Sequence, residues 1–200
     1  AKQAGADGAL IITPYYNKPT QEGLYRHYKA IAESVDLPQV LYNIPGRTGV
    51  NMLPSTVARL CGLQSIVGIK EGSGSVQQAS EIASTCGDRM TVLAGDDALT
   101  LPMMAVGAKG VISVTSNIVP SEMAQLVKAF LSGRIDEARR IHFALSPLFT
   151  ALFYETNPIP VKTALGMMGK IDPELRLPLC GMATETKDQL TRVLKDAGLI

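Results

Sequence analysis

The sequence has no tryptophan, only 5% aromatic residues and only two histidines, His27 and His142. Its three cysteines, Cys61, Cys86 and Cys180, are odd in number and widely spaced, and no CxxC pair occurs. This pattern is typical of reduced thiols in a cytoplasmic protein and argues against a disulfide framework. With so few histidine and cysteine side chains, a zinc site and a Ser-His-Asp triad are both disfavoured. We therefore expect no bound metal.

An excess of one charge and long apolar runs are lacking as well. The 19 basic and 18 acidic side chains leave a formal net charge of +1, so no basic stripe is available for nucleic-acid phosphates. No apolar run reaches the ~18 residues that a membrane-spanning helix needs. What the chain does have is a 46% hydrophobic composition over 200 residues. This predicts a globular protein with a sizeable core and with no nucleic-acid or membrane partner.

Five short apolar segments rich in valine, isoleucine and leucine occupy the first part of the chain. We predict strands at residues 8–13, 39–43, 65–71, 90–96 and 110–115. Their nearly continuous hydrophobicity is typical of strands that are covered on both faces of a parallel sheet. The amphipathic segments between and after them predict helices at residues 21–35, 54–61, 76–85, 99–106 and 120–131. Such alternation predicts βα units, which either close into a barrel or form an open, doubly wound sheet.

The later part of the chain has a different pattern. It predicts helices at residues 135–153, 161–168 and 184–197, with a proline-rich break at 157–160. We therefore expect two domains, a partial barrel at residues 1–134 and a helical region at residues 135–200. A (β/α)₈ barrel needs eight strands, and the first predicted strand follows a segment that looks like the end of a helix. This predicts that the chain is the later part of a longer protein.

The strand ends are the places to look for chemistry, because active sites of parallel α/β proteins lie at the carboxyl ends of the strands. Lys70 is the one lysine at the exit of an apolar strand. Burial there disfavours the ammonium form and lowers the lysine pKa, so the neutral amine can attack a carbonyl and form a Schiff base. Period-2 alternation predicts Ile66, Gly68 and Lys70 on one face, with room for a substrate at Gly68. The alternative is a lysine that only pairs with a carboxylate or extends into solvent.

Other candidates lie at the ends of the first two strands. Tyr42 can shuttle protons for a Schiff base, or it can simply pack at the rim. Arg47 lies in the glycine- and proline-rich segment 44–49, and its planar guanidinium suits a carboxylate or phosphate, or solvent. Tyr15 and Tyr16 are adjacent and therefore point in different directions, one toward a site and the other toward a subunit contact.

Three weaker signals remain. Segment 71–75 has the glycines to cradle a phosphate at a helix start, but it lacks the third glycine of a dinucleotide fingerprint. Asp96 and Asp97 suit Mg²⁺ or a helix start, and the helix start is the favoured interpretation. His27 and His142 fall within amphipathic helices, which indicates structural or surface roles.

Six segments together resemble the pyruvate-dependent class I aldolase family. They are residues 13–19 (TPYYNKP), 42–49 (YNIPGRTG), 69–71 (IKE), 94–97 (AGDD), 110–114 (GVISV) and 157–162 (NPIPVK). The match covers the whole chain in the right order and spacing. It implies an α/β fold, a (β/α)₈ TIM barrel of which this chain holds the last five βα units, followed by a C-terminal helical region. It also implies a homotetramer, built as a dimer of dimers, and no cofactor.

The resemblance further implies a lyase that joins pyruvate to L-aspartate 4-semialdehyde in lysine and diaminopimelate biosynthesis. Lys70 matches the residue that forms the pyruvate Schiff base, and Tyr42 matches the residue that transfers protons. Five more positions match substrate-binding or interface residues: Tyr16 as a proton relay from a neighbouring subunit, Tyr15 near a lysine feedback site at the tight dimer contact, Arg47 as the partner of the aldehyde's carboxylate, and Gly95 and Ile112 as backbone contacts to pyruvate.

Two alternatives stay open. N-acetylneuraminate lyase and other sugar-acid aldolases share the lysine and tyrosine, but only a substrate with its own carboxylate needs the cation of Arg47. The family's first three strands, with a Gly-Thr-Thr-type loop and most of the lysine-binding residues, have no match here. We therefore expect unpaired sheet edges, and the chain by itself could be an inactive fragment or a non-catalytic interaction module.

Overall fold

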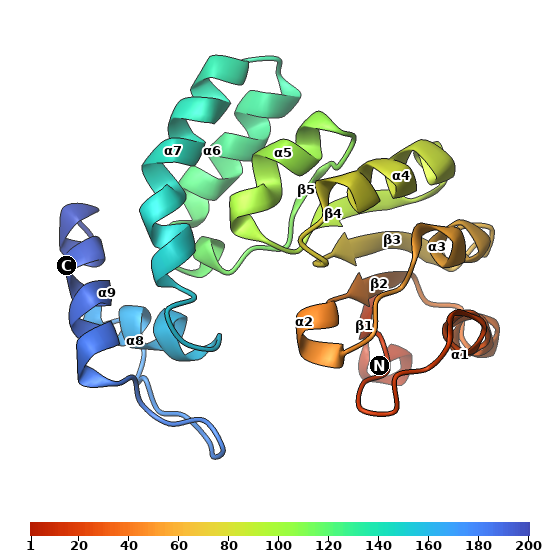
Figure 1. Ribbon diagram of the computed structural model, residues 1–200, viewed down its shortest axis with the longest axis horizontal. Helices are drawn as coiled ribbons and strands as arrows, with labels where there is room; N and C mark the ends of the chain where they lie inside the picture. The colour runs from red at the N-terminus through yellow and green to blue at the C-terminus, as the bar shows by residue number, and fades with distance from the viewer. The chain divides into compact units, whose positions relative to one another are not determined.

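The computed structural model describes residues 1–200 and separates them into two compact units, Ala1–Ile112 and Ser113–Ile200. The first unit holds a five-stranded sheet with its helices, and the second is built of helices only (Figure 1). The domain boundary predicted between residues 134 and 135 lies within the second unit and stays a prediction. None of the helices is both long and apolar enough to span a membrane.

The sheet lies in the first unit. Its strands are β1 (Ala9–Ile12), β2 (Gln39–Asn43), β3 (Ile66–Glu71), β4 (Thr91–Ala94) and β5 (Gly110–Val111). They are hydrogen-bonded in the order β1-β2-β3-β4-β5, and every neighbouring pair is parallel. A doubly wound sheet reverses its strand order at a switch point, whereas a (β/α)₈ barrel adds each new strand on the same side. The sequential order therefore confirms the barrel-type alternative.

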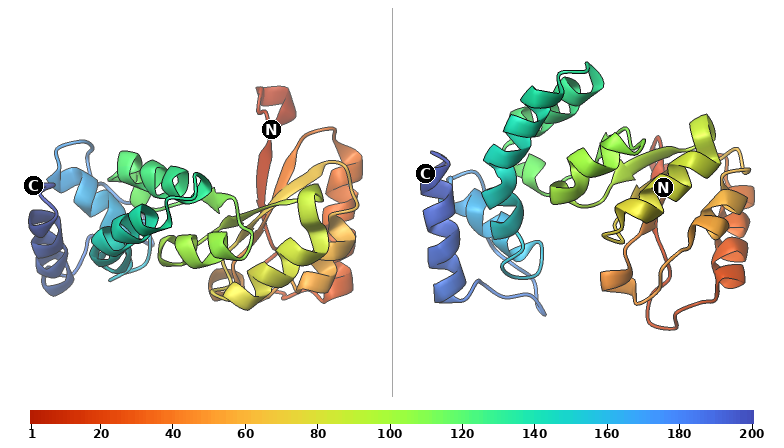
Figure 2. Two further views of the ribbon diagram at one scale, coloured as in Figure 1. Left: turned by 90° about the horizontal axis from the view of Figure 1, so that it is seen from above. Right: turned by 45° about the horizontal axis from the view of Figure 1, so that its top comes forward.

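The helices of this unit are α1 (Gln21–Ser34), α2 (Pro45–Thr48), α3 (Pro54–Leu60), α4 (Val76–Cys86) and α5 (Thr100–Ala105), with short 3₁₀ turns η1 (Lys2–Ala4), η2 (Gly87–Arg89) and η3 (Asp97–Leu99). The ribbon views show α1, α3 and α4 side by side along one face of the sheet (Figures 1 and 2). In α1, Leu24, Tyr28 and Ala32 are buried at four-residue intervals, which places them on one side of the helix. The sequence predicted only a loop where α2 lies, because proline and glycine are typical of turns.

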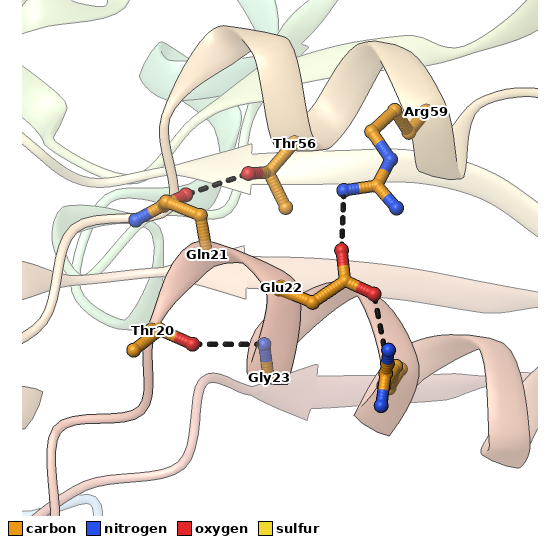
Figure 3. A network of polar contacts seen from close by, with 7 residues as sticks. Thr20, Gln21, Glu22, Gly23, Thr56 and Arg59 are labelled. Atoms are coloured by element: carbon orange, nitrogen blue, oxygen red, sulfur yellow. Dashed lines mark hydrogen bonds and ion pairs between the residues drawn. The ribbon is translucent and has the colours of Figure 1, made fainter.

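Polar side chains fix where α1 begins and how it meets α3 (Figure 3). The hydroxyl of Thr20 accepts a hydrogen bond from the backbone N–H of Gly23 at 3.2 Å, which caps the helix. Gln21 accepts a hydrogen bond from the Thr56 hydroxyl at 2.6 Å, so the first turns of the two helices are joined. The entry into α1 is therefore held both within the helix and from its neighbour.

The sheet has a helix-covered face and an inner face, which is the face of Tyr42 and Lys70. On β2, burial alternates, with Gln39 and Asn43 among the fully buried residues of the covered face. The pairing of β2 with β3 shifts between Gln39 and Val40, so that Ile66 pairs with Gln39. Ile66 therefore joins the covered face, and the prediction that it shares a face with Lys70 was wrong because of this irregularity.

Gly68 has a different reason for being glycine than the sequence suggested. A Cβ atom at this position would lie 2.9 Å from the backbone oxygen of Thr91 on β4. Contacts that short are not made by real side chains, so the close approach of β4 requires glycine here. The residue therefore serves the packing of neighbouring strands.

The second unit contains η4 (Thr115–Asn117), α6 (Pro120–Leu131), α7 (Ile135–Ala151), α8 (Ile159–Met167) and α9 (Thr184–Asp196). Helices α6 and α7 pack against each other across a short turn, where Gly133 has a φ of 76°. Both α7 and α8 contact α9. Helix α8 begins earlier than predicted because Pro160 lies in its first turn, where no backbone N–H is needed.

Candidate active site

Strands β2 and β3 bring two of the predicted residues together. Tyr42 and Lys70 are partners in the register of the two strands, so their side chains leave the sheet on the same face. The Nζ atom of Lys70 lies over the Tyr42 ring, 4.3 Å from its centroid. Both side chains are half-buried at the carboxyl edge of the sheet. An amine and a phenol are therefore adjacent where a barrel enzyme keeps its active site.

The surroundings of Lys70 act on its charge. Burial is the largest influence and lowers the pKa of Lys70, because the ammonium loses hydration. The carboxylate of Asp97 opposes this effect, and the guanidinium of Arg47 lowers the same pKa further. The balance makes the neutral, nucleophilic amine available at lower pH than in a free lysine.

The pKa of Tyr42 is raised, so the phenol keeps its proton. Burial raises the pKa of Tyr42, and the nearby Arg47 guanidinium opposes this shift. The phenol is therefore protonated at neutral pH and can donate a proton to a reacting oxygen or nitrogen. Arg47 is thus within electrostatic reach of both Tyr42 and Lys70.

Arg47 is carried by the short helix α2. The helix is capped by Gly49, which has a φ of 73° and whose N–H donates to the carbonyl of Pro45. A Cβ atom at Gly49 would lie only 2.8 Å from Cε of Lys18, so the loop after β1 packs directly on this turn. The Arg47 side chain is exposed, which leaves it accessible to a bound anion.

Gly95 and Ile112 lie at the same edge of the sheet. The N–H of Gly95 donates to the carbonyl of Glu71 at 2.7 Å, and the N–H of Ile112 donates to Ala94 at 2.9 Å. A Cβ atom at Gly95 would lie 3.0 Å from both Glu71 O and Gly72 Cα. The backbone at Gly95 therefore comes unusually close to the end of β3, one residue beyond Lys70.

Tyr15 and Tyr16 are not part of this cluster. They lie in the loop that follows β1, with 66% and 93% of their surface exposed. Tyr16 has a φ of 63°, a conformation that costs energy for a residue with a side chain. The Tyr16 side chain therefore projects away from its own chain.

Sequence reasoning missed a buried polar cluster on the covered face of the sheet. Glu71 is fully buried, and its carboxylate accepts hydrogen bonds from Asn43 and Gln78, each at 3.1 Å. It also accepts the N–H of Ser73 at 2.6 Å, and Ser75 caps α4. The polar groups of segment 71–75 are therefore hydrogen-bonded within the chain, so this segment is not an open phosphate-binding loop. The available signal was that Asn43 and Glu71 directly follow Tyr42 and Lys70 on paired strands.

The Asp96-Asp97 pair forms a helix start, as favoured. The carboxylate of Asp96 accepts the N–H of Ala98 at 2.9 Å and caps η3. Asp97 is 2% exposed, and its carboxylate raises the pKa of Lys70. No three His, Cys, Asp or Glu side chains come together as a metal site would require.

Residues 1–197 match the model of the Dihydrodipicolinate synthetase family. The 4-hydroxy-tetrahydrodipicolinate synthase of Geotalea daltonii is 62% identical over 200 residues, which make up 100% of this chain and 69% of that protein.

Two solved structures share the fold along the whole chain. The chloride-inhibited dihydrodipicolinate synthase of Acinetobacter baumannii complexed with pyruvate is 47% identical, with a TM-score of 0.97 over 100% of this chain and 68% of that one. A monomeric dihydrodipicolinate synthase variant is 48% identical, with the same TM-score of 0.97 and the same coverage of 100% and 68%. Identity at this level along the full chain, together with the βα order and the Tyr42–Lys70 pair, shows that the chain belongs to the dihydrodipicolinate synthetase family.

Proposed function

We propose that this protein condenses pyruvate with L-aspartate 4-semialdehyde to give 4-hydroxy-tetrahydrodipicolinate and water. The observation that carries the proposal is the Lys70 amine, which is half-buried, has a lowered pKa and lies 4.3 Å from the centre of the Tyr42 ring. Membership in the family supports the choice of substrates, because its named relatives are 4-hydroxy-tetrahydrodipicolinate synthases. The chemistry needs no metal or organic cofactor.

The first half-reaction activates pyruvate. The neutral Lys70 amine attacks the ketone carbon, and the resulting carbinolamine loses its oxygen as water to leave a protonated imine. This imine withdraws electrons, so the methyl group of pyruvate loses a proton and becomes the carbon of an enamine. Tyr42 is placed to transfer these protons. We assign Gly95 and Ile112, at the same edge of the sheet as Lys70, to backbone contacts with pyruvate.

The second half-reaction joins the substrates. The enamine carbon attacks the aldehyde carbon of aspartate semialdehyde, whose oxygen takes a proton and becomes a hydroxyl. The amine of the same substrate then attacks the imine carbon, closes the ring and expels the Lys70 amine. We assign the carboxylate of the semialdehyde to the exposed guanidinium of Arg47, because a planar fork can bind a carboxylate through two hydrogen bonds.

A homotetramer built as a dimer of dimers is the proposed assembly. Its support in this chain is the loop after β1, where Tyr16 is 93% exposed in a strained conformation. We assign Tyr16 to the proton relay of a neighbouring subunit, and Tyr15, beside it, to the contact between the two subunits. One relative is a monomeric variant, so light scattering and the effect of Tyr16→Phe on turnover test this assignment.

The compartment is proposed from the cysteines. All three are free thiols, with Cys61 and Cys86 buried and Cys180 exposed. Unpaired thiols persist in a reducing compartment, which supports the cytoplasm. Fractionation of cells followed by detection of the protein tests this location.

Borohydride trapping tests the mechanism. In the intact protein incubated with pyruvate, borohydride should reduce the imine to a stable secondary amine on the peptide that contains Lys70. Lys70→Arg should abolish the adduct, whereas Lys109→Arg, at the opposite end of the sheet, should retain it. Turnover with aspartate semialdehyde but not with N-acetylneuraminate is expected. A wild-type protein without a pyruvate adduct on Lys70 would refute the proposal.

A further inference from the structure

A closed ring of hydrogen-bonded side chains, buried except for the half-buried Asn51, lies behind the candidate active site. It starts at Glu71, which follows Lys70 and points to the helix-covered face of the sheet. Its carboxylate forms no ion pair and accepts hydrogen bonds from N–H donors alone. Burying a carboxylate costs free energy unless hydrogen bonds replace its lost hydration, so the donors around Glu71 must be held in place.

Two side-chain amides connect Glu71 to the segment that follows α2. Asn43 donates to Glu71 and also to Asn51 at 2.8 Å, and its own carbonyl accepts the N–H of Met52 at 2.9 Å. Gln78 donates to Glu71 and exchanges hydrogen bonds with Asn51 at 2.9 Å and 3.1 Å. Each amide therefore has one orientation only, because turning it over would set donors against donors.

A third amide extends the ring to α1. The side chain of Gln21 donates to the carbonyl of Asn51 at 2.8 Å and accepts the N–H of Leu53 at 3.0 Å. Gln21 is the first residue of α1, directly after Thr20, and it also bonds Thr56 of α3 (Figure 3). The ring thus reaches the end of the loop that carries Tyr15 and Tyr16.

The hydrogen bonds join the three segments that bear the reacting groups. One is the end of β3 with Lys70, the second is the turn with Arg47, and the third is the loop with Tyr16. None of the bonded side chains lies on the inner face with Lys70, so they do not touch the reacting atoms. These side chains instead connect the places where the three segments leave the sheet.

We propose that Glu71 is a positioning residue, and that the ring Glu71–Asn43–Asn51–Gln78 sets the distance between the Lys70 amine and the Arg47 turn. The inference rests on the proposed function, since it assigns a task to groups that serve that reaction. Glu71 orients the last residues of β3, and Asn43 holds Met52 and thereby the exit from the Arg47 turn. Loss of the carboxylate should therefore affect both substrates, through two different loops.

Glu71→Gln in the intact protein is the direct test. The variant keeps the shape of the side chain, but its new NH2 group must face either the N–H of Ser73 or the amide groups of Asn43 and Gln78, so at least one of these donors loses its acceptor. We expect the rate constant for pyruvate trapping by borohydride to fall roughly tenfold to hundredfold, the size of loss that small misplacements cause. We also expect the KM for aspartate semialdehyde to rise. Partial unfolding would lower the amplitude of trapping but leave its rate constant and this KM unchanged.

The chain offers a matched control in α4. Glu81 also accepts a side-chain amide, that of Gln77 at 3.0 Å, but it does so on the exposed surface. Glu81→Gln makes the same chemical change outside the ring and should leave the trapping rate and the KM as in the wild type. Equal losses in both variants would contradict the positioning role.

A rescue variant keeps the test decisive if Glu71→Gln folds poorly. Adding Asn43→Asp to Glu71→Gln returns a carboxylate to the ring and restores the net charge. With Asn51 and Gln78 turned over, donors again meet acceptors around the ring, and only the long 3.4 Å bond from Gln78 to the Met52 carbonyl is lost. We expect the double variant to recover most of the trapping rate. No recovery in a folded double variant, or a wild-type rate constant in Glu71→Gln, would overturn the inference, whereas an absent adduct in the wild type would overturn the proposed function.

Discussion

At the residue scale, the proposed chemistry depends on a lysine whose charge is set by burial and by two charged neighbours. Burial lowers the pKa of Lys70, the carboxylate of Asp97 raises it, and Arg47 lowers it again. The same arginine is the candidate partner of the second substrate's carboxylate. In the proposed mechanism, substrate binding at Arg47 and nucleophile activation at Lys70 are therefore electrostatically coupled.

Asp97→Asn and Arg47→Ala should shift the pH profile of pyruvate trapping in opposite directions. Removing the Asp97 carboxylate takes away a group that favours the ammonium, so the pKa of Lys70 falls and the acidic limb moves to lower pH. Removing the Arg47 cation takes away a group that disfavours the ammonium, so the limb moves to higher pH. Trapping rates measured across the pH range check the direction of the shift in each variant. Shifts of the acidic limb in the same direction would contradict the assignment.

Arg47→Ala should also separate the two half-reactions. Schiff-base formation with pyruvate does not use this cation for binding, so the adduct should still form once the pH shift is allowed for. Condensation with aspartate semialdehyde should weaken by ~2–5 kcal/mol, the usual cost of breaking a desolvated charge pair. This equals roughly 30- to 4,000-fold in kcat/KM. Loss of trapping at every pH in a folded variant would show that Arg47 shapes the site instead.

At the element scale, short polar contacts decide where helices begin. Thr20 caps α1, Ser75 caps α4, and both helices start directly after loops at the carboxyl edge of the sheet. These caps orient the loops as well as the helices. Glu22, in the first turn of α1, bonds both Arg26 and Arg59, which lowers the pKa of its carboxyl group.

Thr20→Ala should destabilise the protein through α1. The substitution leaves the N–H of Gly23 without its acceptor, and loss of an N-cap costs about 0.5–2 kcal/mol. Thr20→Ser keeps an oxygen at the same position and should retain most of the stability. Denaturant unfolding of the two variants beside the wild type checks this difference. Equal stability of Thr20→Ala and the wild type would show that the cap contributes nothing here.

At the scale of the whole molecule, the sheet has two unpaired edges, since β1 and β5 each pair on one side only. Apolar side chains are exposed on the sheet, with Leu10 at 48%, Ile12 at 38% and Val67 at 42%. Ile12 is the register partner of Tyr42, so part of this apolar surface belongs to the inner face. Exposed edges and apolar faces favour association between chains.

A protein that consists of residues 1–200 alone should therefore self-associate. We expect light scattering to show particles larger than one chain, growing with concentration, and weaker pyruvate trapping than in the intact protein. Leu10→Glu should reduce the association, because it puts a charge on β1, which is itself an open edge strand of the sheet. A monodisperse single chain with full trapping activity would contradict this expectation.

The sequence by itself determined the order of the five strands and of every α-helix except α2, because strand and helix periodicities are local properties of the chain. It also singled out Lys70 and Tyr42, since each ends an apolar strand. The tertiary structure alone decided which residues share a face: an irregular register removed Ile66 from the face of Lys70, and α2 formed where glycine and proline indicated only a loop. The pairing of β2 with β3 likewise set Glu71 beside Asn43, a contact between residues far apart in the chain that no local pattern encodes.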